Sequence, residues 1–569
     1  MKKIRSLAAG AMILAAASIA WAAPDTADVV FLHGRIHTED ANRSVAQALA
    51  LRGNSILAVG TDQAVSALVG PHTRSVDLGG KVVLPGIIDA HTHPAEGAQD
   101  LDKCSLGDET LTPAEIKARV AHCLKQASDR TLWFEVVQVN ASGLTLTLKD
   151  LDAMLADRPM LLESADGHTI WANSAALKAS HIDAGTLDPT GGRILHDAGG
   201  NPTGTLRDTA AEIALGAKPA PSLEFEAAQL ARAFDAMRAV GITSVQDADT
   251  DDHDMQMYRR LYDTHRLNMR VRATFGLKDT HRPAAVLIGE AIKFRTKWAV
   301  DPEFLRADAV KIFADGVIEY PSQTAALLKP YLDAAGRPTD NRGPTYYPQE
   351  QLNSVVSAAD AAGFTVHIHA IGDRAVRSSL DAFADARRRN GTSDNRDQIA
   401  HLELIDPADF PRFKQLGVIA NLQLQWAMRD PYIVKSTLPY LGPERSRYLY
   451  PARSLYDAGA LIAGGSDWGV STFDPFEAME HGITRCEARG REPLLPEQAL
   501  DLQTLVDAYT INAAFALKQE RTTGSLEPGK RADLIVLDRD IFAIDPFDLH
   551  KTRVLSTYLD GREVYAAKR

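Results

Sequence analysis

The feature that most constrains the fold is a series of eight short apolar runs, most of them separated by segments with helical periodicity. The first run ends at His91 and the last is Leu461–Gly464. The runs between them are Ile242–Gln246, Val271–Phe275, Ala309–Phe313, Phe364–His369, Ile399–Leu402 and Val418–Asn421. Alternation of strands and helices favours a parallel sheet, and eight such units predict an α/β fold with a closed, TIM-like (β/α)₈ barrel.

Both ends of the chain differ from this alternation of strands and helices. Short strand-like runs and turn signals recur before Leu84, and Ala532–Leu537 and Val554–Leu559 continue the pattern near the C-terminus. Neither end holds enough strand to bury a core alone. We therefore expect residues 24–84 and 520–569 to form one small β-sandwich domain. The barrel would comprise residues 85–99 and 224–519.

The interval between the first two barrel strands is longer than one βα unit requires. It contains the strand-like segments Phe134–Val139 and Met160–Glu163, together with several glycine-rich turns. We expect residues 100–223 to form an inserted lid or substrate domain that folds over the mouth of the barrel.

Residues 1–23 have the pattern of a bacterial signal peptide. Lys2, Lys3 and Arg5 precede the apolar stretch Leu7–Ala20, which is short for a membrane span, and Ala20-Trp21-Ala22 is a small-x-small cleavage site. This pattern predicts a periplasmic or secreted protein. No later run is long and apolar enough for a transmembrane helix, so we expect no membrane association after signal removal. The formal charge of −12 disfavours nucleic acid as a partner.

The chain has three cysteines, Cys104, Cys123 and Cys486. In an oxidising compartment, pairing of Cys104 with Cys123 is favoured over two free thiols, and Cys486 is then left over. The sequence contains no Cys-x-x-Cys pattern, which argues against a thiolate zinc site.

Residues that commonly bind metals gather where the predicted barrel strands end. His91 and His93 are two residues apart, so on a strand they face the same side. A lone His-x-His pair would as often be an ordinary strand-end pair, but further runs also end in such residues. These are Lys311 in the fourth run, His367 and His369 in the fifth, His401 in the sixth, and Asp467 after the eighth. Barrel sites lie at the C-terminal strand ends, and imidazole with carboxylate suits zinc or a similar divalent ion.

These stretches resemble the amidohydrolase superfamily, in the branch called amidohydrolase family 3 or YtcJ-like metal-dependent hydrolases. The resemblance covers almost the whole chain after the signal segment. It lies in Pro85–His93, Val310–Gly316, His369–Ala375 and Gly465–Asp467, and more weakly in Asp166–Asn173, Asp474-Pro475 and Gly529–Leu534. The resemblance implies hydrolysis of a carbon–nitrogen bond other than a peptide bond, in a small amide-type or N-acyl substrate.

The resemblance also implies the metal ligands. His91 and His93 would hold one ion, and His401 with His369 a second. His367 then either supports a ligand or packs as an ordinary barrel histidine. Lys311 either carries a carbamate that bridges two ions or stays unmodified beside a single ion. Zinc is the expected metal, with one ion or two.

Asp467 would be both a ligand and the catalytic proton shuttle. It would take a proton from the metal-activated water and pass it to the leaving nitrogen. The alternative is an aspartate that caps the following helix. For substrate binding, the candidates are His168, Trp171 and Asn173 in the insertion and Trp468 after the last strand, each of which could equally be a packing residue.

Two other functions remain open at this stage. The same metal centre would suit an ester or lactone hydrolase, and a non-catalytic periplasmic metal- or ligand-binding protein would keep the ligands without turnover. The sequence has no Gly-x-Ser-x-Gly elbow, and no Walker or dinucleotide glycine pattern follows a strand. The oligomeric state, including a homo-oligomer, is not set by the sequence.

Overall fold

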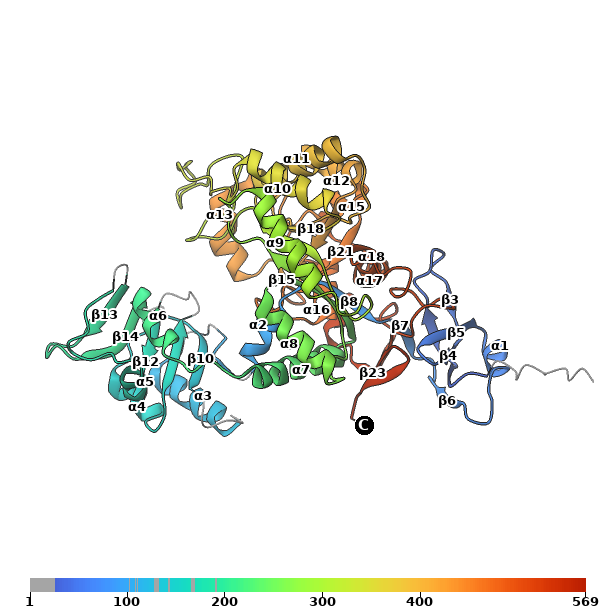
Figure 1. Ribbon diagram of the computed structural model, residues 1–569, viewed down its shortest axis with the longest axis horizontal. Helices are drawn as coiled ribbons and strands as arrows, with labels where there is room; N and C mark the ends of the chain where they lie inside the picture. The colour runs from blue at the N-terminus through green and yellow to red at the C-terminus, as the bar shows by residue number, and fades with distance from the viewer. Residues whose placement is uncertain are drawn as a thin grey trace, which may run out of the picture.

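The computed structural model describes residues 26–568, apart from 102, 108, 110, 127–132, 142–143, 165–168 and 190–191. The predicted signal peptide lies outside the described residues. At the centre is an eight-stranded parallel sheet that curls into a nearly closed barrel (Figure 1). In sheet order, which is also chain order, its strands are β8 (Ile87–Thr92), β15 (Ile242–Thr250), β16 (Arg270–Gly276), β17 (Leu305–Phe313), β18 (Thr365–Ala370), β19 (Gln398–His401), β20 (Ile419–Leu422) and β21 (Ile462–Gly464). The predicted barrel is confirmed.

The two ends of this sheet, β8 and β21, meet along a seam. Across it, the N–H of Asp467 donates to the carbonyl oxygen of His91 at 2.7 Å. The side-chain amide of Asn421, in the neighbouring strand β20, donates to the carbonyl oxygen of Ala90 at 2.9 Å. These polar contacts lie next to the predicted metal ligands, and Ile88, Ala90 and Ala463 pack in one buried apolar cluster at the same seam.

Helices cover the outside of the barrel because their apolar residues recur on one face. Ser222 caps α7 (Leu223–Ala239) by accepting from the N–H of Phe225, and Asp251 forms a capping box at α8 (Asp252–Asp263). The others are α9 (Ala284–Lys297), α10 (Gln349–Ala361), α11 (Asp373–Asn390), α12 (Phe410–Leu416), α13 (Leu438–Leu441), α14 (Pro443–Ser446), α15 (Ala452–Asp457), α16 (Pro475–Thr484), α17 (Leu502–Tyr509) and α18 (Ile511–Ala516). No described helix is long and apolar enough to span a bilayer.

Both chain ends contribute to a pair of smaller sheets. The first sheet has the order β5-β4-β1-β6 and the second β24-β23-β22-β7-β2-β3. One apolar cluster includes side chains from both sheets, such as Leu49 and Leu534. The strands are β1 (Val29–Leu32), β2 (Arg35–His37), β3 (Val45–Ala46), β4 (Ala48–Arg52), β5 (Ser55–Gly60), β6 (Arg74–Asp77), β7 (Val82–Pro85), β22 (Leu534–Leu537), β23 (Val554–Leu559) and β24 (Arg562–Ala566).

A buried ion pair joins the barrel to the C-terminal strands. Arg270, the first residue of β16, donates from Nε to Asp533 at 2.7 Å and from Nη2 to Asp560 at 3.2 Å. The Arg270 and Asp533 side chains are 4% and 2% exposed. Charges this deeply buried need their partners.

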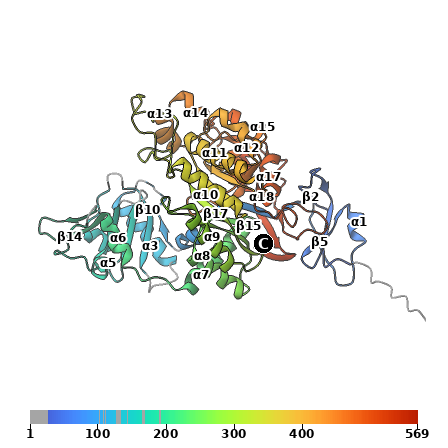
Figure 2. The same cartoon turned by 45° about the horizontal axis from the view of Figure 1, so that its top comes forward.

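The inserted unit forms its own six-stranded sheet, with the order β13-β14-β12-β11-β10-β9. Figures 1 and 2 show it beside the barrel, so its coverage of the barrel mouth stays a prediction. It leaves the barrel after α2 (Pro94–Asp100) and returns before α7. Its elements are β9 (Cys104–Ser105), α3 (Pro113–Gln126), β10 (Phe134–Val139), α4 (Leu148–Met154), β11 (Met160–Ser164), β12 (Thr169–Ala172), α5 (Ser174–Ala179), β13 (Gly192–His196), β14 (Pro202–Asp208) and α6 (Thr209–Gly216).

The disulfide expected in this unit is present and joins Cys104 of β9 to Cys123 of α3. Replacing both cysteines with serine is expected to lower the unfolding free energy of the unit by about 3 kcal/mol, because the bond restricts the unfolded chain. Faster hydrogen exchange in β10 and β11 measures the effect, with α10 of the barrel as the internal control. Unchanged exchange in both strands would contradict a stabilising role.

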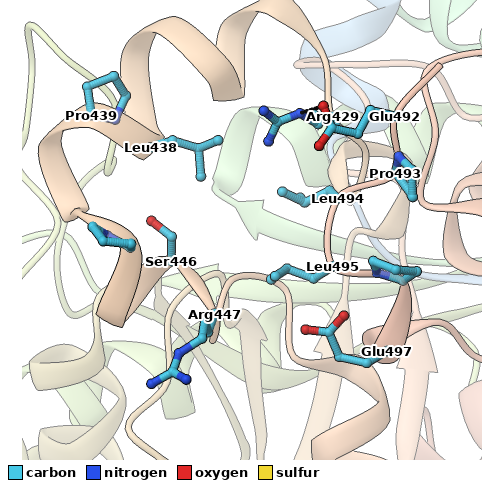
Figure 3. A pocket seen from close by; sticks show the side chains of 12 residues that line it. Arg429, Leu438, Pro439, Ser446, Arg447, Glu492, Pro493, Leu494, Leu495 and Glu497 are labelled. Carbon is cyan, nitrogen blue, oxygen red and sulfur yellow. Dashed lines mark ion pairs between the residues drawn. The ribbon is translucent and has the colours of Figure 1, made fainter.

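A cavity of about 570 Å³ lies between the segment after β20 and the segment after α16 (Figure 3). Arg429 and Glu492 form an ion pair on its wall, with Nε and Oε2 3.1 Å apart. Its other lining residues are Leu438, Pro439, Pro443, Ser446, Arg447, Pro493, Leu494, Leu495, Pro496 and Glu497. None of the predicted metal ligands lines this cavity, so the centre described next is a different site.

Candidate metal centre

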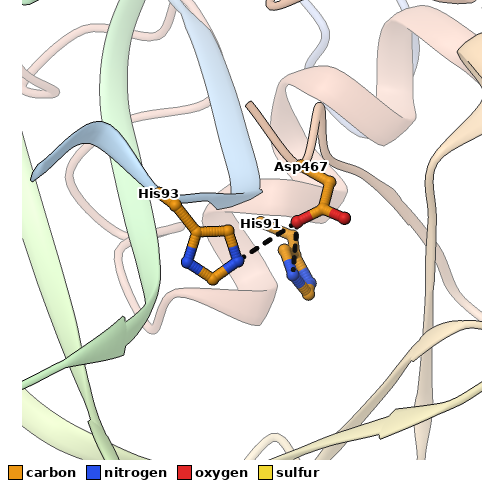
Figure 4. A group of neighbouring side chains, drawn as sticks. All are labelled: His91, His93 and Asp467. Atoms are coloured by element: carbon orange, nitrogen blue, oxygen red, sulfur yellow. Dashed lines mark ion pairs between the residues drawn. The ribbon is translucent and has the colours of Figure 1, made fainter. Parts of the chain in front are cut away.

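Three of the predicted ligands converge at the C-terminal ends of the barrel strands (Figure 4). His91 lies in β8, His93 follows that strand, and Asp467 follows β21. Oδ1 of Asp467 is 3.2 Å from Nε2 of His91 and 3.1 Å from Nε2 of His93. One donor atom from each residue lies within 4.8 Å of the others, which is the arrangement that a divalent ion requires.

The backbone around Asp467 is held in an unusual conformation. Asp467 has a φ of 52° and His401 a φ of 74°, both in the left-handed region that side chains rarely adopt. The buried carboxylate of Asp89 accepts from the Ser466 N–H at 2.9 Å and from the Ser466 hydroxyl at 2.6 Å. These two bonds fix the residue before Asp467, so the Asp467 carboxylate stays beside the histidines.

A second pair of histidines lies next to this group. The ring centres of His369 and His401 are 4.3 Å apart, and that of His401 is 4.9 Å from that of His91. Nδ1 of His401 is buried without a hydrogen-bond partner, 4.0 Å from Oδ2 of Asp467. A buried nitrogen without a partner is costly unless it binds something. The donor set therefore fits a metal ion.

Lys311 completes the group. Its side chain is buried, and Nζ lies 3.4 Å from Nε2 of His91. Burial lowers the pKa of Lys311 to about 8, although Asp467, Asp249 and Asp247 act in the opposite direction. A substantial fraction of this amine is therefore neutral at mildly alkaline pH.

Electrostatics put His91, His369 and Asp467 in their metal-binding protonation states. Burial acts to lower the pKa of His93 as well, but its contact with Asp467 outweighs burial and raises that pKa. Burial lowers the pKa of His91 to about 3 and that of His369 to about 4, so both rings are neutral near pH 7. Burial acts to raise the pKa of Asp467, but His91 and His93 outweigh it and hold that pKa well below its usual value. Neutral imidazoles with an ionised carboxylate are the forms that bind a cation.

His367 contacts a ligand and belongs to a buried network that the sequence analysis missed. Its Nε2 lies 2.8 Å from Nδ1 of His91. The network also contains the side-chain amides of Gln246, Gln398 and Asn421. All three are fully buried amides on barrel strands. Asn421, which lies between apolar residues of β20, could have been identified from the sequence.

Two predicted substrate contacts have structural roles instead. Asn173 is completely buried: its side-chain oxygen accepts from the N–H groups of Met160 and Ala176, and its nitrogen donates to two backbone carbonyls. It caps α5 and has no hydrogen-bonding capacity left for substrate. Trp171 is 4% exposed in the core of the inserted unit. His168 lies outside the described residues.

The two tryptophans near the last strands differ from one another. The Trp468 ring packs against Phe473, with ring centres 4.9 Å apart, and lies close to Gly97 of α2. Its carbonyl oxygen accepts from the N–H of His93 at 2.6 Å, so Trp468 positions a ligand through its backbone. The Trp426 ring instead stacks on that of His401 at 6.1 Å.

Comparison with known proteins gives a consistent result. A family model described as "Amidohydrolase family" matches residues 74–565. The chain is 30% identical over 548 residues to N-substituted formamide deformylase of Arthrobacter pascens, covering 94% of this chain and 97% of that one. It is 29% identical over 508 residues to a Bacillus subtilis (strain 168) protein named YtcJ, covering 87% and 91%.

Solved structures agree on the fold. An uncharacterised metal-dependent hydrolase from Pyrococcus furiosus superposes with a TM-score of 0.72 at 23% identity, covering 90% of this chain and 99% of that chain. The family match begins at β6 and ends within β24. It therefore includes the whole barrel with its ligand group. The chain therefore belongs to the amidohydrolase family.

Proposed function

We propose that the protein is a metal-dependent hydrolase of carbon–nitrogen bonds in small non-peptide amides or N-acyl compounds. The observation that carries this is the convergence of His91, His93 and Asp467 at the C-terminal strand ends, beside His401 with its unpartnered nitrogen. The formamide deformylase, which aligns over nearly its full length, supports the choice of bond.

The proposed roles follow from the geometry. His91, His93 and Asp467 hold a divalent ion, with zinc expected, and His369 and His401 hold a second if two are bound. The ion supplies Lewis-acid chemistry, polarising a carbonyl and acidifying a water. Asp467 takes the proton of the attacking water on Oδ2 and delivers it to the leaving nitrogen. Lys311, as a neutral amine, could add CO₂ through Nζ and lose one proton to solvent, and the resulting carbamate would be a further anionic ligand.

The test is a substrate panel assayed at defined metal content. Purified protein is stripped with a chelator and reloaded with zinc, manganese or cobalt. It is then assayed on N-substituted formamides, N-acyl amino acids and small amides, with matched esters and lactones. We expect turnover that disappears with the metal, returns on reloading, and has a higher kcat/KM for the amides.

Two results would contradict the proposal. A higher kcat/KM on the matched esters would assign the centre to ester or lactone hydrolysis. Stoichiometric metal without turnover on any member of the panel would favour a metal- or ligand-binding protein. An unrelated zinc protein carried through the same stripping and reloading is the control for metal-catalysed background.

We also propose that the protein is exported and that the inserted unit covers the barrel mouth when substrate is bound. The Cys104–Cys123 disulfide supports export, since such bonds persist in oxidising compartments. Fractionation of expressing bacteria, with and without residues 1–23, tests the location.

A further inference from the structure

His367 lies in the barrel interior, and its two ring nitrogens contact different partners. Nε2 is 2.8 Å from Nδ1 of His91. Nδ1 is 2.9 Å from the side-chain nitrogen of Gln246 and 3.1 Å from the side-chain oxygen of Gln398. All four residues are fully buried, so each ring nitrogen depends on these neighbours for its hydrogen bond.

The two glutamines make opposite demands on this histidine. A neutral imidazole has one N–H and one bare nitrogen. The Gln246 amide group is a donor and needs a bare Nδ1, whereas the Gln398 oxygen is an acceptor and needs Nδ1–H. Nδ1 can satisfy only one of them at a time.

Neighbouring bonds hold both glutamines in these orientations. The Gln398 amide nitrogen donates to the Gln246 side-chain oxygen and to the Ala516 carbonyl, both at 3.2 Å. Asn421 donates to the Gln398 oxygen at 2.9 Å. The Gln246 oxygen is therefore already used by Gln398, and its N–H remains directed at His367.

With Gln246 as the partner, each hydrogen bond in the series from Gln246 through His367 to His91 is donated in the direction of Asp467. Gln246 donates to Nδ1 of His367, and Nε2–H of His367 donates to Nδ1 of His91. His91 then carries its proton on Nε2 and donates it to Oδ1 of Asp467 across 3.2 Å. In this state His91 has no lone pair to offer a metal ion on Nε2.

With Gln398 as the partner, the bonds run the other way. His367 donates from Nδ1 to Gln398 and accepts on Nε2 from Nδ1–H of His91, which leaves Nε2 of His91 bare. The pair carries two ring protons in both states. On going from the first state to the second, one proton moves from Nε2 of His367 to Nδ1 of His91. Nε2 of His91 releases one proton, and Nδ1 of His367 takes one up. The Gln246 amide group then faces an N–H, and this contact between two donors disfavours the state.

We propose that metal binding at His91 is coupled to this tautomer switch of the His91–His367 pair, with Gln398 favouring the metal-binding state and Gln246 the metal-free state. His367 is thus a positioning residue that acts through His91. The inference rests on the metal centre proposed above and adds a buried element that sets the metal affinity.

The test is to change the two glutamines and measure metal affinity by competition with a chromophoric chelator, using zinc and cobalt. Gln246→Glu accepts from His367 Nδ1–H while its other oxygen still accepts from Gln398, so the metal should bind about 10-fold more tightly. Gln398→Met removes the acceptor and should weaken binding by about 10- to 100-fold. Gln246→Met, which only removes the donor, should also tighten binding.

The control is Gln498→Met. Gln498 is a buried glutamine that bonds Ser454 far from the barrel centre. It should leave metal affinity unchanged, and melting temperatures of all apo variants separate affinity from folding. The ¹⁵N spectrum of protein with ring-labelled histidine is the second readout: His367 Nδ1 should change from bare to protonated on metal binding.

The outcomes separate this inference from the proposed function. If the wild-type protein binds no divalent ion, the metal centre is wrong and the inference fails with it. If it binds metal but the Gln246 and Gln398 variants shift affinity in the same direction, or not at all, only the switch is overturned. Opposite shifts with an unchanged Gln498 control support it.

Discussion

Asp467→Asn is expected to lower kcat by about 10²- to 10⁴-fold, the range typical for loss of a positioned acid–base group. Asparagine has nearly the same shape and tolerates the left-handed φ of 52° at this position, so the fold should persist. The amide still offers an oxygen to a metal ion but cannot take up a proton near neutral pH. The measurement is kcat on the best substrate of the panel, together with metal content and the circular dichroism spectrum.

Asp474→Asn is the matched control for this change. Asp474 follows the same strand and caps α16 by accepting from the N–H of Phe476 at 2.9 Å. Asparagine caps helices as well as aspartate does, so activity and stability should stay near wild type. An Asp467→Asn protein that retains full metal and wild-type kcat would show that another group carries the proton.

Arg270→Met is expected to destabilise the fold by about 3–5 kcal/mol, because it leaves Asp533 charged and buried without its partner. The loss should appear as a lower melting temperature in a thermal scan, since this pair joins β16 to the C-terminal strands. Changing Asp533 to leucine in the same chain removes the stranded charge and should recover part of the loss.

Arg259→Met provides the control for removing an arginine. Arg259 pairs with Asp263 one turn along α8, and both side chains are about half exposed, at 48% and 47%. Exposed pairs of this kind contribute about 0.3–0.5 kcal/mol. Equal shifts in melting temperature for Arg259→Met and Arg270→Met would show that burial of the Arg270 ion pair does not increase its contribution to stability.

The barrel could be predicted because its information is local. Strands such as β20 and β21 are short and largely apolar, and helices such as α10 and α11 show their periodicity within a few turns. The spacing of His91 and His93 places both on one strand face without knowledge of any neighbour. Asp467 could be added because barrel strands bring their C-terminal ends to one rim.

The rest depends on contacts between distant segments. Gln246 and His367 lie on strands that are not neighbours in the sheet, so their contact requires the curvature of the closed barrel. Arg270 and Asp533 meet only because the C-terminal strands dock against the barrel. Asn173 was misassigned although a local signal existed: an asparagine directly before a helical segment is a typical cap.

The seam between β8 and β21 has a consequence for assembly. His91 comes from the first barrel strand and Asp467 from the segment after the last. Polar contacts and the buried apolar cluster that contains Ile88, Ala90 and Ala463 link the two sides. The ligand set therefore does not exist until the whole barrel sequence has folded, since long-range closure comes late. An ion bound by both residues would join the first and last strands of the closed barrel. Incomplete chains that lack one of these strands would therefore be unable to retain it.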